Sequence, residues 1–574
     1  MQKPLSIHRH GVLPLSSYSL VRSARHVILT AQTARRVTLR TIQQSGSLVW
    51  LGPMQRWSLG RMIPSDFKPC RQFTIHLKKI PFMPANHTCN TTARHVTRRA
   101  RARFALVLTA LCPAAVVVQA ENEAGHYPLV APHAETVAEV AQSLWQWAEL
   151  GYLETQSSAL LQRTLSDAGF SLTTGLADIP TAFSASFGSG EPIIGIMGEF
   201  DALPGISQAA VPYAETLDGK PSGHACGHNL FGAGSLGAAL AVRDWLEQSG
   251  HSGTVRFYGT PAEEGGSGKV YLVRAGAFDD VDVMLHWHPG DENTASPKST
   301  LANKSAKFRF SGISAHAAGA PERGRSALDA IEAMNYMVNL LREHVPEETR
   351  IHYVITEGGI APNVVPNFAE SFYYVRHPSA AVLAEIWERL MKAANAAALG
   401  TETSVTHEVI HGNHSVLPNE VLSTAVYNQL QRLGGVHYDA QDQQFAHALA
   451  TTLPGGIYEP GSESAITPFE PGYTKGSTDV GDVSWNVPTA GLSTATFIPG
   501  TGLHTWQAVA TGGTPLAHKG TLLAAEIIAA TAVELLTDAE LVAAAQAEFY
   551  ARRGDNFVYT PLLGDREPPL DYRK

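Results

Sequence analysis

The chain has 574 residues, of which 44% are hydrophobic, and it carries a formal net charge of −9 at pH 7. This length predicts about two to four domains, and the composition is that of a globular protein with a large core. Residues 1–120 hold 18 of the 43 Lys and Arg residues but one of the 52 Asp and Glu residues, so the rest of the chain is strongly acidic. An acidic body argues against nucleic acid and anionic membranes as partners, since binding to both depends on clustered Lys and Arg.

Residues 98–120 have the three-part pattern of a secretory signal peptide. Basic residues at 98–103 precede an apolar run over 104–118, and small residues end the run before Ala120. The run is about 15 residues long and contains Pro113, so it is too short and too interrupted to span a bilayer. We therefore expect cleavage near Ala120 and export, to the periplasm or as a secreted protein. Residues 1–82 either precede the natural start or form an organellar transit peptide, which leaves a cytoplasmic or organellar location as the alternative.

From Glu121 onward, helical and strand patterns alternate, which predicts an α/β domain. Apolar residues at helical spacing predict two helices within 134–169, and a helix rich in small residues is expected over 230–248. Short apolar runs at 192–197 and 254–258 predict buried strands. This pattern covers residues 121–300, the first part of the domain.

A different pattern begins near residue 301. Its order is strand, helix, two strands, helix and strand, which is a βαββαβ unit. The expected strands are at 306–310, 351–356, 369–375 and 404–410, and the expected helices at 326–343 and 380–398. Residues 416–550 then return to the α/β pattern and 551–574 form a tail. The unit at 301–415 is therefore predicted to be inserted between two parts of one α/β domain.

Residues 223–229, Gly-His-Ala-Cys-Gly-His-Asn, place a thiol and two imidazoles beside flexible glycines. Cys226 is the only cysteine after residue 120, so the mature chain would contain no internal disulfide. Because thiolate and imidazole both bind metal ions, Cys226 and His228 are the first candidates for a metal site.

Glu263 and Glu264 follow the strand expected at 254–258 and precede two glycines. Adjacent carboxylates in extended chain point to opposite sides, so one can bind a metal ion while the other faces a substrate. The second carboxylate would serve as a general base, because water activated by a metal ion must still lose its proton.

Two further stretches supply histidines. His286 and His288 end an apolar strand and face the same side of it, so this pair alone does not decide which one binds a metal ion. His504 lies in a glycine-rich loop at 500–506. A cysteine, three histidines and a glutamate are enough ligands for two metal ions with a position open for water.

In chain order, these motifs resemble the M20 metallopeptidase family over residues 125–550. The Cys-Gly-His variant is similar to the amidohydrolase subfamily and, within it, to the branch that contains the B subunit of p-aminobenzoyl-glutamate hydrolase. The resemblance implies a zinc-peptidase-like α/β/α catalytic domain with an inserted ferredoxin-like α+β domain that serves as lid and dimerisation domain. The motifs are Gly-Glu-Phe-Asp-Ala-Leu-Pro-Gly at 198–205, His-Ala-Cys-Gly-His-Asn at 224–229, Pro-Ala-Glu-Glu-Gly-Gly at 261–266, Leu-His-Trp-His-Pro at 285–289 and Gly-Leu-His at 502–504.

The resemblance also implies roles for individual residues. Two divalent ions, Mn or Zn, would be bound per chain, with Glu263 as the general base. His316 in the lid would act in the site of a partner copy, and Asp479 would orient a ligand. Asn363 and Arg376 would contact a carboxylate of the substrate. The implied metal ligands are Cys226, His228, Glu264, His286 and His504.

The implied activity is metal-dependent hydrolysis of the amide bond in N-acyl or N-aroyl amino acids. The favoured substrate is p-aminobenzoyl-glutamate or a related folate fragment. A homodimer through the lid is expected, and a second, related protein chain is a further candidate partner. Two alternatives remain: a carboxypeptidase or dipeptidase of the same family, and a non-catalytic binding protein on the same fold.

Overall fold

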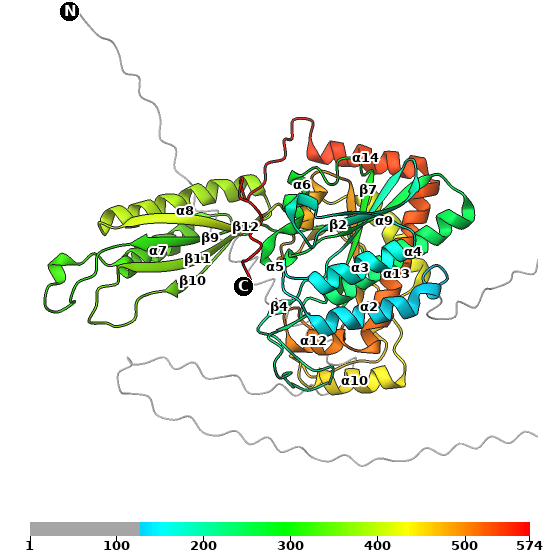
Figure 1. Cartoon of the computed structure of the whole chain (residues 1–574), viewed down its shortest axis with the longest axis horizontal. Coiled ribbons are helices and arrows are strands. Elements are labelled where there is room, and N and C mark those ends of the chain that lie inside the picture. Colours follow the sequence, from blue (N-terminus) through cyan, green and yellow to red (C-terminus); the bar gives the residue numbers. More distant parts are fainter. Residues whose placement is uncertain (1–126) are drawn as a thin grey trace, which may run out of the picture. The chain divides into compact units, whose positions relative to one another are not determined.

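The computed structural model describes residues 127–574 (Figure 1). The signal peptide expected over 98–120 and the segment 1–82 lie outside the described residues, so export stays a prediction.

A six-stranded mixed sheet, in the order β1-β2-β6-β3-β7-β14, forms the centre of the larger domain. Its last four strands run parallel, whereas β1 and β2 join in antiparallel pairs. Parallel strands covered on both faces are apolar throughout, as in the Ile-Ile-Gly-Ile-Met-Gly run of β3. The strands are β1 (Ser171–Thr174), β2 (Phe183–Ser189), β3 (Ile193–Gly198), β6 (Gly253–Gly259), β7 (Val283–Gly290) and β14 (Thr489–Ala495), and two-residue pairs are β4 (Leu203–Pro204) with β5 (Ser222–Gly223) and β8 (Lys298–Ser299) with β13 (Gly472–Tyr473).

Helices cover both faces of the six-stranded sheet, which confirms the expected α/β/α arrangement. Helices α2, α3, α4, α9 and α13 share one core with the strands, and α6 and α11 share a second core on the other side. Helix α13 is long and apolar enough to cross a membrane, but most of it is buried against α4 and α9. The helices of this domain are α2 (Ala134–Trp147), α3 (Thr155–Asp167), α4 (His228–Ser249), α5 (Glu263–Gly266), α6 (Gly268–Arg274), α9 (Glu420–Leu433), α10 (Ala440–Ala450), α11 (Val480–Ser484), α12 (Trp506–Gly512), α13 (Pro515–Thr537) and α14 (Ala539–Arg553).

Four further strands form a separate antiparallel sheet in the order β10-β11-β9-β12. Helices α7 and α8 pack on this sheet around a core that contains Phe308, Tyr373 and Trp387 (Figure 1). This βαββαβ unit is the ferredoxin-like domain expected from the sequence, and we call it the lid. Its elements are β9 (Ala302–Ser311), α7 (Ala327–Leu341), β10 (Arg350–Glu357), β11 (Phe368–His377), α8 (Ala380–Gly400) and β12 (Ser404–Asn413).

Glycines in α4 allow this helix to lie close to the sheet. A Cβ atom at Gly234 would stand 2.7 Å from the ring of Trp287 in β7, and one at Gly232 would stand 2.8 Å from the carbonyl oxygen of Glu199. Neither position has room for a side chain. The close approach brings His228, the first residue of α4, to the ends of β3 and β7.

A fully buried lysine joins three distant parts of the catalytic domain. The Nζ atom of Lys269 in α6 lies 2.7 Å from Oε1 of Glu199, after β3, and 2.7 Å from Oδ1 of Asp479, before α11. The backbone N–H of Lys269 also donates to Asp479 Oδ2. Although burial opposes it, Asp479 and Glu199 raise the pKa of Lys269 above its ordinary value. One ammonium group thus balances two buried carboxylates.

Replacing Lys269 by Met should lower the free energy of unfolding by about 3–5 kcal/mol, because two buried carboxylates would lose their cation. The matched control is Lys392→Met at an exposed position of α8, which should change this free energy by less than about 0.5 kcal/mol. Urea denaturation measures both variants. Equal stability of Lys269→Met and the unmodified protein would contradict this role of the lysine.

Candidate metal centre

The candidate ligands meet at the carboxyl-terminal edge of the parallel strands. Loops from several strands converge at this edge in open α/β sheets, which makes it the usual place for a binding site. Glu263 and Glu264 follow β6, His288 lies near the end of β7, Cys226 and His228 stand at the start of α4, and His504 precedes α12.

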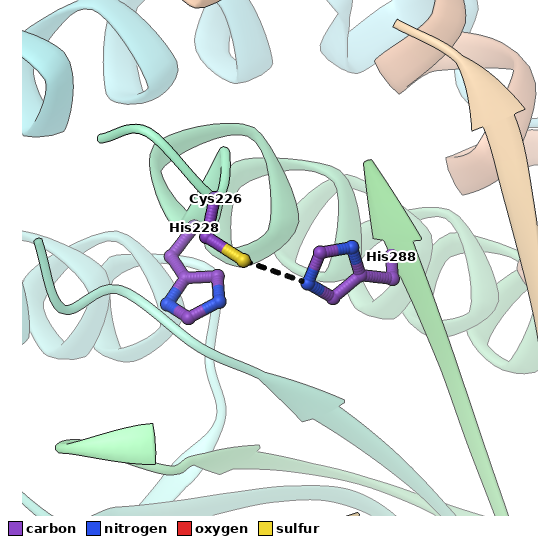
Figure 2. A group of neighbouring side chains, drawn as sticks. All are labelled: Cys226, His228 and His288. Carbon is purple, nitrogen blue, oxygen red and sulfur yellow. Dashed lines mark hydrogen bonds between the residues drawn. The ribbon is translucent and has the colours of Figure 1, made fainter. Parts of the chain in front are cut away.

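Two groups of side chains that can each hold a metal ion share Cys226. The first is Cys226, His228 and His288, and the second is Cys226, Glu264 and His504. Within each group the ligand atoms lie within 4.8 Å of one another. The Cys226 Sγ atom is 3.4 Å from His288 Nε2, and the ring of His228 lies on the other side of the sulfur (Figure 2). Cys226 is therefore the candidate ligand that these two groups have in common.

The adjacent carboxylates of Glu263 and Glu264 enter different groups. Glu264 belongs to the group with Cys226, and its Oε1 atom lies 3.0 Å from His504 Nε2. Glu263 belongs to a third group, with Glu199 and His228. The turn that carries them is flanked by Ala262 and Gly265 at φ 57° and 85°, the left-handed region. Glu263 therefore stands beside the shared ligands, where a base can act.

Carboxylates that follow β3 hold His228 in place. Its Nδ1 atom is 2.9 Å from Asp201 Oδ1, and its Nε2 atom is 3.0 Å from Glu199 Oε2. The other oxygen of Asp201 accepts a hydrogen bond from the backbone N–H of Glu264. Asp201 on Nδ1 fixes the orientation of the ring. Nε2 and the facing Glu199 Oε2 are both buried without a hydrogen-bond partner within the described residues, which suits a metal ion between them. Neither Glu199 nor Asp201 had a role predicted from the sequence, although two acidic residues just after a buried strand are a usable signal.

The structure brings His288, and not His286, into the groups of ligands. Both histidines face the same side of β7 (Val283–Gly290), as the alternation predicted, but His286 lies two residues, about 7 Å, farther from the end of the strand than His288. A Cβ atom at Gly491 of β14 would stand 2.4 Å from His286 Nε2, so the His286 ring packs over the neighbouring strand. These positions favour His288 as the third histidine ligand over His286, which the resemblance implied.

The electrostatics of the site fit bound cations. Burial, with Glu264 nearby, raises the pKa of the Cys226 thiol, and burial, with Glu199 and Glu264 nearby, raises that of Glu263. These groups become anionic when a cation lies beside them. Thiolate, imidazole and carboxylate are the donors that zinc and related ions bind. The kinds of donor atoms and their closeness to one another thus suit divalent metal ions.

Except for the fully buried His228, the members of these groups line a cavity of about 850 Å³ that also receives side chains from the lid. Arg376 of β11 reaches this cavity, as do His286 and Tyr374. The guanidinium of Arg376 makes one long contact, 3.5 Å, to Ser477 Oγ. Its place suits the predicted contact with a carboxylate of the substrate.

The other predicted residues lie farther from the ligands. Asp479 contacts Lys269, so it reaches His228 only through Lys269 and Glu199. His316 and Asn363 lie side by side in the lid, where the backbone N–H of Ala317 donates to the Asn363 carbonyl. Neither lines the cavity of its own chain.

Comparison with known proteins agrees with this geometry. Residues 195–507 match the peptidase family M20/M25/M40. The chain is 43% identical over 437 residues to the B subunit of p-aminobenzoyl-glutamate hydrolase from Escherichia coli, a match that covers 71% of this chain and 91% of the relative. It is 31% identical to the human Xaa-Arg dipeptidase, over 72% of this chain and 89% of that relative.

Solved structures show the same fold. A putative aminohydrolase from methicillin-resistant Staphylococcus aureus matches with a TM-score of 0.53 at 17% identity, over 71% of this chain and 98% of that one. A dinuclear metal-binding peptidase of the M20 family from Bacillus subtilis matches with a TM-score of 0.50 at 20% identity, over 71% and 99%. The family expected from the motifs is confirmed. The chain belongs to the peptidase family M20/M25/M40 and is a hydrolase of amide bonds.

Proposed function

We propose that this protein is an amidohydrolase with two metal ions, Mn or Zn, that cleaves N-acyl or N-aroyl amino acids. The favoured substrate is p-aminobenzoyl-glutamate, for which the relative with 43% identity is named. The observation that carries the proposal is the pair of ligand groups that share Cys226, with Glu263 beside them and Arg376 in the same cavity.

Different residues of the chain serve different steps of the hydrolysis. Divalent ions held by Cys226 and its partners would polarise the amide carbonyl and make the attacking water more acidic. Glu263 takes a proton from this water while the water oxygen forms a bond to the carbonyl carbon. It then delivers the proton to the amine nitrogen as the carbon–nitrogen bond breaks. Arg376 orients the substrate through a forked pair of hydrogen bonds to a carboxylate.

We further propose that two copies associate through the lid. Strand β10 is an edge of the lid sheet and exposes Val354 (59%) and Ile355 (43%), while α7 exposes Tyr336 (67%) and Leu340 (52%). Such an apolar edge is suited to pairing with another strand. A dimer would also explain why His316 lies outside its own cavity. Two Escherichia coli relatives are named as the A and B subunits of p-aminobenzoyl-glutamate hydrolase, which makes a second, related protein chain the alternative partner.

The metal-loaded protein should hydrolyse p-aminobenzoyl-glutamate and, among a panel of N-acyl amino acids and dipeptides, favour N-aroyl amino acids. Removal of metal with a chelator should abolish hydrolysis, and Mn or Zn should restore it. Release of p-aminobenzoate, followed by chromatography, is the measurement. Glu263→Gln is the control, because it should keep both ions while kcat falls by about 100- to 10,000-fold. Full activity of the metal-free protein would refute the proposal, and a preference for dipeptides would favour the dipeptidase alternative.

His288→Ala should reduce the metal content from two ions per chain to one, because the first group loses a ligand. The affinity for the ion that is lost should be lower by more than about 100-fold. This exceeds the loss expected from removing a residue that only hydrogen-bonds to a ligand. His286→Ala, two residues earlier on the same strand, is the matched control and should retain both ions. Elemental analysis after dialysis measures the content. Loss of an ion from His286→Ala alone would restore the assignment made from the sequence.

Val354→Asp should weaken the proposed dimer by about 100-fold or more, since an unpaired charge would be buried at the interface. Val558→Asp changes a valine that is also exposed (79%) but lies outside the lid, and it should leave the dimer intact. Sedimentation equilibrium gives the association constants. The same mass for the unmodified protein and both variants would argue against pairing through β10.

A further inference from the structure

A tail was predicted over 551–574; helix α14 includes 551–553, and the remaining segment 554–574 packs against the catalytic domain and places Arg573 in the cavity lining. Leu563 is buried in the core that α6 and α11 share. Arg274 of α6 donates to the carbonyl oxygens of Gly564 and Arg566, and Arg566 in turn donates to carbonyl oxygens of Val409 and Ile410 in β12. These contacts hold the segment on both sides before it reaches the cavity.

The last part of this segment contacts the turn that carries the catalytic carboxylates. The Tyr572 hydroxyl and Arg573 Nη2 both donate to the carbonyl oxygen of Glu264, at 3.0 and 2.6 Å. The Tyr572 ring packs edge-on against Tyr152. Arg573 thereby becomes part of the cavity lining.

Arg573 has hydrogen-bonding capacity that the protein does not use. A guanidinium has five N–H donors, and a bond to the Glu264 carbonyl together with a contact to Tyr572 leaves most of them free. The Nε atom of Arg573 is buried and lacks a hydrogen-bond partner within the described residues, and the same holds for Nε of Arg376. A buried, unpaired donor is costly, so both groups favour an anionic partner from outside the chain.

Arg376 and Arg573 are the two Lys or Arg side chains among the residues that line this cavity. One comes from the lid and the other from the segment 554–574. The carboxylates that line the cavity already have other partners. Glu199 contacts Lys269 and His228, and Glu263 and Glu264 belong to the groups of candidate metal ligands. The two guanidinium groups therefore remain for the substrate.

We propose that Arg573 binds a second carboxylate of the substrate, while Arg376 binds the first. The amine released on hydrolysis is then a dicarboxylic amino acid such as glutamate or aspartate, and Arg573 selects it over neutral amino acids. This inference rests on the proposed function for the location of the substrate, and it makes Arg573 a specificity-determining residue. Forked bonds from arginine to carboxylate give both affinity and orientation.

The test compares two ligands that cannot be hydrolysed, N-(4-aminobenzyl)glutamate and N-(4-aminobenzyl)glutamine, in which a methylene replaces the amide carbonyl. Isothermal titration calorimetry on the metal-loaded full chain gives both dissociation constants. The unmodified protein should bind the glutamate compound about 10- to 100-fold more tightly than the glutamine compound. In Arg573→Gln this ratio should fall to within about threefold, through weaker binding of the glutamate compound alone.

Lys574→Gln is the matched control, because it removes the same charge from the neighbouring, exposed residue and should keep the ratio. Arg573→Lys retains the positive charge but cannot form two parallel hydrogen bonds to one carboxylate, so it should give an intermediate ratio. It replaces Arg573→Gln if that variant does not fold. An unchanged ratio in the Arg573 variants, an equal weakening of both compounds, or no preference in the unmodified protein would overturn the inference. Binding is measured here without turnover, so the two hypotheses can fail separately. Failure to hydrolyse any N-acyl amino acid would count against the proposed function, whereas the role of Arg573 is decided by the ratio of the two dissociation constants.

Discussion

The buried ammonium of Lys269 is the interaction on which the catalytic domain depends. It lies between Glu199, at the end of β3, and Asp479, at the start of α11, and these chain segments are 280 positions apart in the sequence. Two carboxylates in a nonpolar interior repel each other and lose hydration, so neither would remain ionised there without a cation. Because Glu199 also faces His228, the same cation supports the first of the metal ligands.

Around this ion network the site is assembled from ends of strands and from one helix start. Cys226 stands where α4 begins, and the glycines of α4 let the helix approach β3 and β7 closely enough for its sulfur to meet His288. Glu264 arrives from the neighbouring strand, on a turn with left-handed residues. Arg376 of the lid and Arg573 of the segment 554–574 also line the cavity. The candidate ligands thus come from the catalytic domain, whereas the cavity around them draws on both domains.

Much of this could be predicted from local patterns. The βαββαβ order of the lid follows from hydrophobic periodicity, because each of its helices and strands covers one face of a core that it shares with its sequence neighbours. The ligands on the loops after β6 and before α4 follow from residue type and position at strand ends. Periodicity failed at β7, since residues 286 and 288 share a face and differ only in their distance from the edge of the sheet. In the folded chain His286 packs against β14 while His288 stands with Cys226 and His228, which favours His288 as the ligand.

The order of the motifs along the chain was sufficient to indicate the family, the chemistry of the ligands and the inserted lid, because each of these depends on residues close together in the sequence. Lys269, within an apolar helix, and Arg573, in a stretch without a regular pattern, carried no local signal of their roles. Their partners are residues 199, 479 and 264, and such distant contacts exist only after the chain has folded. Long-range charge pairing and packing at the edge of the sheet therefore came from the tertiary structure. Cys226 lies between the two cases. The sequence marked it as a candidate ligand, and folding placed it in two groups of candidate ligands.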